Sequence, residues 1–230
     1  MNTLVNVARY HLVDRVQLGL LPPAVTAFAF LVNLIIFALL PTRPDAGYYA
    51  GGLLAPYIFF FILGVLTLTR SLPFAFALGL SRRSYYLGTV GCFLTLAGVY
   101  GFVITVLQAI ERATGGWGIA MHFFRVPWIL DGAWYLTWVT AFVLLMLVFA
   151  YGMWFGLISR RWSVTGVLTF AAVQVTVLLA AAVVVTWLDA WASVTAAFAT
   201  LSVLGFTGVV AAVALALTLG GFGTMRKATV

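Results

Sequence analysis

The chain alternates between long apolar stretches and short polar connections. Its 12 Lys and Arg residues and its 5 Asp and Glu residues all lie outside six of these stretches. A helix needs about 20 predominantly apolar residues to cross a bilayer. The pattern therefore predicts an all-α membrane protein with six transmembrane helices. The six stretches are Pro22–Leu40, Leu53–Thr69, Tyr86–Ile110, Trp134–Ile158, Ser163–Leu188 and Val194–Leu219.

Composition agrees with this pattern. The 230 residues are 64% hydrophobic and 7% charged, and the mean hydropathy is +1.15. No connection is long enough for a soluble domain, so residues 1–230 are expected to form one transmembrane domain. We divide it into an interfacial helix (1–20), a six-helix bundle (22–219) and a cytoplasmic tail (220–230). The single cysteine, Cys92, excludes an internal disulfide.

The basic residues predict the orientation. Nine Lys and Arg residues fall on one side of the predicted spans and three on the other. The side that is richer in basic residues is cytoplasmic, so both termini are expected inside, in a multi-pass protein of the cell membrane. The basic residues are scattered in pairs beside spans, which does not suit nucleic-acid binding. The nine are Arg9, Arg15, Arg70, Arg82, Arg83, Arg160, Arg161, Arg226 and Lys227.

Residues 3–18 predict an amphipathic helix in the cytoplasmic interface. At 100° per residue, Val5, Leu12 and Val16 share one face, and Asp14 lies opposite. The helix either anchors the chain before its first span or also contacts a partner.

The second cytoplasmic loop predicts a short helix. This apolar helix begins near Pro73 and ends at Gly79 as a C-cap, and Ser81 is placed to cap the next helix. Arginines stand on both sides of it. Such a helix either presents an apolar knob to a soluble partner or dips Phe74 and Phe76 into lipid.

The third outer loop, 111–134, is the longest connection. A Gly-Gly-Trp-Gly turn at 115–118 precedes a predicted short surface helix over 119–130, which is either a passive surface element or part of a gate. The connections at 159–162 and 188–193 are predicted to be tight turns. Tyr85 and Tyr86 are expected at the inner membrane interface, since amphipathic rings prefer the headgroup level.

Three amides stand out inside the spans. An amide in hydrocarbon must find a partner, so each is expected to bond another helix or to contact a substrate in a path between helices. Gly152 and Gly156 form a GxxxG pattern that permits close helix packing. The three amides are Asn33, Gln108 and Gln174.

Enzyme signatures do not occur in the chain. His11 and His122 fall on opposite sides of the membrane and cannot share a metal within one subunit. The sequence has no phosphate-binding loop and no nucleophile elbow. We therefore expect no catalytic residue, no metal and no cofactor in this chain. The spans also carry no ionisable group for a proton or ion relay, so any energy for transport would come from a partner.

The segment 72–89 reads LPFAFALGLSRRSYYLGT. It resembles the coupling-helix segment of ABC transporter permease subunits of the ABC-2, exporter-type class, especially actinobacterial members, where an apolar helix leads into Gly-x-Ser/Thr-Arg-Arg and an aromatic pair. The six spans, the two cytoplasmic termini and the N-terminal interfacial helix resemble the same class over nearly the whole chain. Many exporters of this class carry a re-entrant hairpin between spans five and six. Here that connection is expected to be only about six residues long.

The resemblance implies a permease that pairs with a second permease, identical or homologous, and docks on a separate ATPase subunit. ATP and Mg would bind to that partner, and lipid would surround the bundle. An apolar path suits a lipid-like, peptide or drug-like cargo better than an ion. The alternatives are a substrate-binding membrane subunit of a vitamin uptake system, a membrane-embedded enzyme and a non-transporting scaffold. The residues expected to contact the ATPase are Arg70, Pro73, Phe74, Phe76, Leu78, Arg82 and Arg83.

Overall fold

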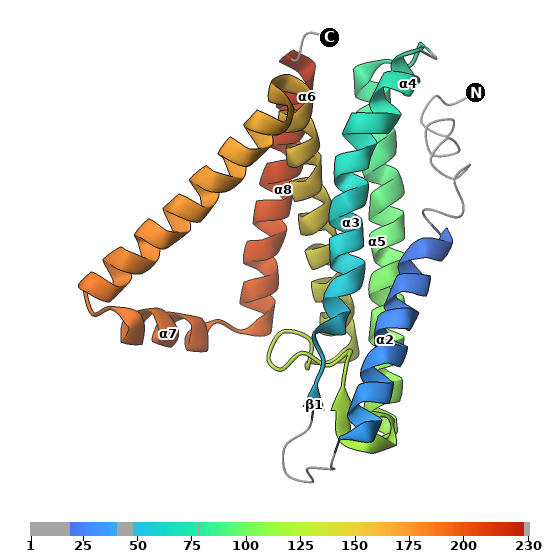
Figure 1. Ribbon diagram of the computed structural model, residues 1–230, viewed down its shortest axis with the longest axis vertical. Helices are drawn as coiled ribbons and strands as arrows, with labels where there is room; N and C mark the ends of the chain where they lie inside the picture. The colour runs from blue at the N-terminus through green and yellow to red at the C-terminus, as the bar shows by residue number, and fades with distance from the viewer. Residues whose placement is uncertain (1–18, 41–47, 78, 228–230) are drawn as a thin grey trace.

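The computed structural model describes residues 19–40, 48–77 and 79–227, and helices dominate it (Figure 1). Within this part of the chain, five helices are long and apolar enough to cross a membrane. The predicted all-helical, membrane-like character is thereby confirmed. The amphipathic helix predicted over 3–18 lies outside the described residues. The five helices are Leu21–Leu39, Gly51–Ala77, Arg82–Ala113, Trp134–Trp187 and Val203–Met225.

The helices follow one another in the order of the predicted spans, and the connection between α5 and α6 covers residues 114–133. A two-residue parallel ladder joins β1 (Tyr48–Tyr49) to β2 (Met121–His122) at the end of the bundle opposite α4. The remaining elements are α2 (Leu21–Leu39), η2 (Gly51–Leu53), α3 (Leu54–Leu66), η3 (Thr67–Ser71), α4 (Leu72–Ala77), α5 (Arg82–Ala113), η4 (Gly116–Ala120), α6 (Trp134–Trp187), α7 (Trp191–Thr200) and α8 (Val203–Lys227).

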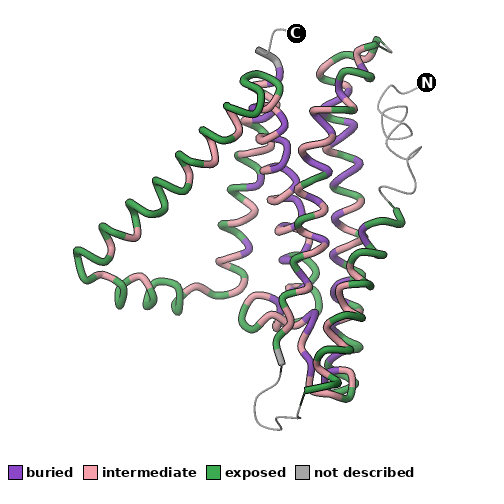
Figure 2. Tube along the Cα trace, in the orientation of Figure 1, coloured by how far each residue is buried: buried purple, intermediate pink, exposed green. Residues whose placement is uncertain are grey.

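The chain reverses direction inside α6. Ser163 has φ 56° and ψ −158°, which no helical residue adopts, and the ribbon bends sharply there (Figure 1). The predicted turn at 159–162 is therefore displaced, because these four residues remain helical and the break falls on the next residue. Up to Ser163, α6 packs within the bundle. Beyond it, residues 164–187 run away from the bundle and are mostly exposed (Figure 2).

The last predicted span is wrong in its boundaries. The apolar run from Val194 is divided into α7 and α8 by Leu201, whose ψ of 117° is extended. The Ser202 hydroxyl then accepts a hydrogen bond of 3.1 Å from the Gly205 amide and begins α8. The connection between α6 and α8 thus contains a helix of ten residues. At its other end, α8 continues past Gly220, where the span was expected to stop, to Lys227.

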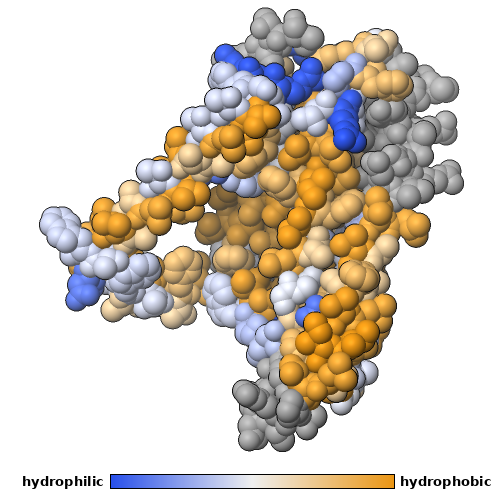
Figure 3. Space-filling model, in the orientation of Figure 1, coloured by the Kyte–Doolittle hydropathy of each residue, from blue (hydrophilic) through white to orange (hydrophobic). Residues whose placement is uncertain are grey.

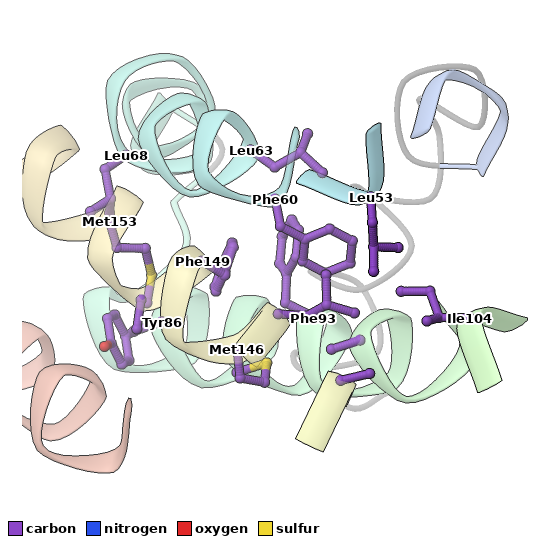
Figure 4. Packing of buried hydrophobic residues seen from close by; sticks show 14 of the residues in the cluster. Leu53, Phe60, Leu63, Leu68, Tyr86, Phe93, Ile104, Met146, Phe149 and Met153 are labelled. Carbon is purple, nitrogen blue, oxygen red and sulfur yellow. The ribbon is translucent and has the colours of Figure 1, made fainter. Parts of the chain in front are cut away.

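The core lies between α3, α5 and the first half of α6. Phe60, Phe93 and Phe149 come from these three helices and are at most 1% exposed. The rings of Phe93 and Phe149 stack with centroids 3.8 Å apart, and Phe60 meets Phe93 edge to face (Figure 4). In lipid, where burial of apolar area gives little net gain, such close contacts hold the helices together.

Glycines bring α3 and α6 into backbone contact. A Cβ atom on Gly64 would overlap the Phe149 carbonyl oxygen, and one on Gly152 would overlap that of Phe61. At Gly156 a Cβ atom would lie 3.0 Å from the Val65 carbonyl oxygen. The GxxxG pattern of α6 therefore serves packing against α3 within the chain.

Candidate functional site

Five arginines gather at the end of the bundle where α4 lies. Arg70 belongs to η3, Arg82 and Arg83 begin α5, and Arg160 and Arg161 precede the break in α6. The visible surface is most hydrophilic at this end (Figure 3). The acidic residues that the structure describes lie elsewhere, at the end of α5, just before α6 and between α6 and α7. The α4 end thus carries a net positive charge among the described residues.

The short helix α4 is bounded as the sequence predicts. Gly79 has φ +75°, and its amide bonds the Phe76 carbonyl at 2.9 Å, while the Leu80 amide bonds the Ala75 carbonyl at 3.1 Å. This is a Schellman termination, which requires the left-handed conformation that glycine adopts without strain. The Ser84 amide then donates to the Ser81 hydroxyl at 3.2 Å. The predicted C-cap and N-cap are both confirmed.

A wide turn sets the direction of α4. At η3 the Leu72 amide bonds the Thr67 carbonyl, five residues back, so the helix is locally unwound between α3 and α4. The Tyr85 hydroxyl donates to the same carbonyl at 2.7 Å. The Tyr85 side chain is fully buried, and its position at the inner interface stays a prediction. Its neighbour Tyr86 is also buried and donates to Thr218 of α8 at 2.5 Å.

The residues predicted to contact a partner divide into exposed and packed ones. Phe74 is 51% exposed and Pro73 is exposed beside it, whereas Ala75 is buried. Phe76 is half-buried, and the Arg82 guanidinium lies 5.8 Å from its ring centroid. The Arg82 guanidinium therefore lies over the Phe76 ring on the side of α5. Arg70 and Arg83 are exposed, and Leu78 lies outside the described residues.

The three intramembrane amides are not brought together. Asn33 donates to the Ala29 carbonyl of its own helix at 2.8 Å. Gln108 is buried and donates to the Leu130 carbonyl in the outer loop. Gln174 accepts from the Tyr151 hydroxyl and so joins the two halves of α6. Each amide has a partner within the chain, as expected for groups in hydrocarbon, and their contact with a substrate stays a prediction.

The outer loop folds around one carboxylate. Glu111, at the end of α5, is 1% exposed. Its Oε2 accepts hydrogen bonds from the Phe123 and Phe124 amides, both at 2.9 Å, and from the Trp117 indole at 3.1 Å. Its Oε1 accepts from the Arg125 amide at 3.2 Å. The side chain thus supplies the hydrogen-bond partners of a loop that has little secondary structure of its own.

Two arginines share a second carboxylate beside this loop. Asp131 accepts from Arg125 at 2.7 and 2.9 Å and from Arg112 at 2.9 Å. The hydrogen bond from Arg125 holds the pKa of Asp131 below its ordinary value of 3.8, and the charges of both arginines act in the same direction. The same hydrogen bond raises the pKa of Arg125.

These contacts replace the surface helix that the sequence predicts over 119–130. Trp117, Ala120 and Trp128 have positive φ angles, and β2 pairs with β1 in the middle of this segment. A helix would bond its amides internally, whereas here three consecutive amides bond Glu111. The sequence analysis gave the Glu111 side chain no role. The sequence feature that could have indicated this role is an acid at the end of an apolar run, shortly before a Gly-rich turn.

Comparisons with known proteins give no relative for this chain. No known family, no curated protein and no solved structure matches it. Among the described residues, no three His, Cys, Asp or Glu side chains are grouped as metal ligands would be.

Proposed function

We propose that the chain is the transmembrane permease subunit of an ATP-driven exporter, which pairs with a second permease and docks on a separate ATPase through α4. The observation that carries the proposal is the construction of α4. It is a capped apolar helix, the turn before it is tied to α5 by the Tyr85 hydroxyl, and Arg70, Arg82 and Arg83 flank it. A capped apolar projection with a positive rim suits a cleft on a soluble protein.

The six-span topology belongs to the same proposal. The 54 residues of α6 would extend about 80 Å as one straight helix, far beyond the roughly 30 Å of a bilayer core. The reversal at Ser163 divides α6 into two lengths that each suit one crossing, so five helices provide six passes. The arginines of the α4 end then make that end cytoplasmic, which is the end where the last described residues of α8 also lie (Figure 1).

Two further features support an exporter-type permease. The ten-residue α7 stands between the fifth and sixth passes, where many exporters of the ABC-2 class carry a re-entrant hairpin. The connection is therefore longer than the six residues that the sequence predicts, and the chain differs less from that class. The part of α6 beyond Ser163 is largely exposed to the surroundings of the bundle. A second permease would have an apolar surface available there.

The test is co-purification from native membranes in mild detergent. The tagged chain is expected to retain a nucleotide-binding subunit, found by mass spectrometry and by ATPase activity. Phe74→Asp should release this subunit, because it places a charge on the exposed apolar face of α4. Trp134→Asp is the matched control, since Trp134 is 64% exposed at the opposite end. If the unaltered chain emerges folded and alone, the permease proposal fails.

A substrate-binding subunit of an uptake system is the second candidate. The observation that favours it is an apolar cavity at the outer end with Tyr49, Tyr57 and Arg125 in its wall. Stoichiometric binding of a small water-soluble vitamin by the isolated chain, without any ATPase contact at α4, would favour this candidate over the first.

A further inference from the structure

The cavity at the outer end has the dimensions of a ligand site. Its volume is about 580 Å³, and small-molecule sites commonly measure about 300–1,000 Å³. One wall comes from α3, including Leu54, and the facing wall comes from α6, with Leu144 and Val148. Residues 125–130 of the outer loop contribute another part of the wall. The lining is apolar except at a few positions, which favours an occupant with an apolar body.

Tyr57 supplies a buried hydroxyl in this wall. The oxygen is shielded from solvent and has no hydrogen-bond partner among the described residues. Buried polar groups are almost always paired, and one without a partner calls for a specific explanation. A ligand that places an acceptor in the cavity would supply the missing hydrogen bond.

Arg125 supplies a cation at the edge of the same cavity. Its Nε and Nη2 atoms donate to Asp131, and among the described residues Nη1 makes no hydrogen bond. Asp131 is also shared with Arg112, so two guanidinium groups face one carboxylate. Glu111 lies nearby, but its oxygens are occupied by backbone amides and the Trp117 indole. Arg125 and Arg112 are balanced in charge by Asp131 and Glu111, so the edge of the cavity offers the Nη1 of Arg125 as a charged hydrogen-bond donor.

We propose that this cavity binds a single-chain anionic amphiphile. Its head group accepts hydrogen bonds from Arg125 and Tyr57, and its alkyl chain lies along Leu54, Leu144 and Val148. This inference does not depend on the proposed transporter role, because the cavity belongs to a single chain and lies at the end opposite α4.

The test uses palmitate as the probe. The full-length chain is reconstituted in nanodiscs of phosphatidylcholine, and a photoreactive palmitate is crosslinked and mapped by mass spectrometry, with empty nanodiscs as background. We expect saturable labelling of one probe per chain, confined to residues 49–57 and 125–148. Leu144→Trp places a larger ring in the wall along which the alkyl chain would lie and should weaken the saturable labelling.

Point variants separate the two polar contacts. Tyr57→Phe should weaken binding about tenfold, as expected for the loss of a hydrogen bond to a charged group. It should also raise the thermal stability of the ligand-free chain, because it removes an unpaired buried hydroxyl. Arg125→Gln should weaken binding at least as much. Arg112→Gln is its matched control, since Arg112 bonds the same carboxylate without lining this cavity, and it should leave binding within about twofold of the original.

Three results would overturn the inference. The first is labelling that Leu144→Trp and Tyr57→Phe leave unchanged. The second is equal competition by palmitate methyl ester, which lacks the charge. The third is displacement of palmitate by a two-chain anionic phospholipid but not by unlabelled palmitate. A chain that binds palmitate yet never co-purifies with an ATPase would uphold this inference while refuting the permease proposal.

Discussion

Replacing Glu111 should destabilise the outer loop strongly. In Glu111→Ala, four donors lose their acceptor, and two of them, the Phe123 and Phe124 amides, are buried. An unpaired buried donor costs about 1–3 kcal/mol, so these two amides alone would cost about 2–6 kcal/mol. A polar cavity of about 110 Å³ adjoins Glu111, and water entering from it would pair part of what is lost. We therefore expect a decrease of about 2–4 kcal/mol in the free energy of unfolding.

The measurement is unfolding of the detergent-solubilised chain by sodium dodecyl sulfate, together with amide hydrogen exchange. Glu111→Gln is the matched control. An amide oxygen in the position of Oε2 keeps three of the four hydrogen bonds, and only the nitrogen facing the Arg125 amide is mismatched. Glu111→Gln should lower the free energy of unfolding by less than half as much as Glu111→Ala. A loss below about 1 kcal/mol for Glu111→Ala, without faster exchange at 123–125, would refute this account.

Three further predictions concern packing, backbone strain and charge. Gly152→Ala should lower the free energy of unfolding by about 1–3 kcal/mol in the same assay, because the added methyl group meets the backbone of α3. Gly91→Ala is the control and should be neutral or stabilising, since a methyl group at Gly91 faces open space. Equal effects of the two substitutions would contradict the close contact. Ser163→Gly should stabilise the chain by about 1 kcal/mol, since φ 56° and ψ −158° are tolerated mainly by glycine, and a loss of stability would contradict this. Because the pKa of Asp131 is lowered on folding, its contribution is complete above the ordinary value of 3.8 and is lost as the pH falls through the lowered value. The unfolding midpoint should therefore fall on acidification below about pH 4 less in Asp131→Asn than in the unaltered chain.

Local signals in the sequence predicted local structure well. The first span was placed to within one residue at each end, because apolar length alone defines it. The caps at Gly79 and Ser81 were also found, since a cap depends on a few neighbouring residues. The GxxxG pattern correctly indicated a close contact, although only the structure identifies α3 as the partner helix.

Features that depend on distant contacts were missed. The outer loop was predicted as a helix because its composition allows one, while its actual conformation depends on a carboxylate twelve residues before Phe123. The division between α7 and α8 falls within an apolar run, where hydropathy gives no sign of an extended residue at Leu201. The buried Tyr85 hydroxyl bonds the Thr67 carbonyl of the wide turn at η3, a contact that sequence periodicity does not reveal. The contacts of α4 with a partner stay a prediction.

The second half of α6 is a long helix joined to the first half by the single break at Ser163. From Val164 to Trp187 it extends about 36 Å at 1.5 Å per residue. The Tyr151–Gln174 hydrogen bond and the contact of Phe155 with Phe170 tie its nearer part to the first half. A rotation of 10° about Ser163 would carry the far end through about 6 Å. The non-helical residues on either side of α7 are the places where the backbone would absorb that displacement while α8 keeps its packing against the bundle.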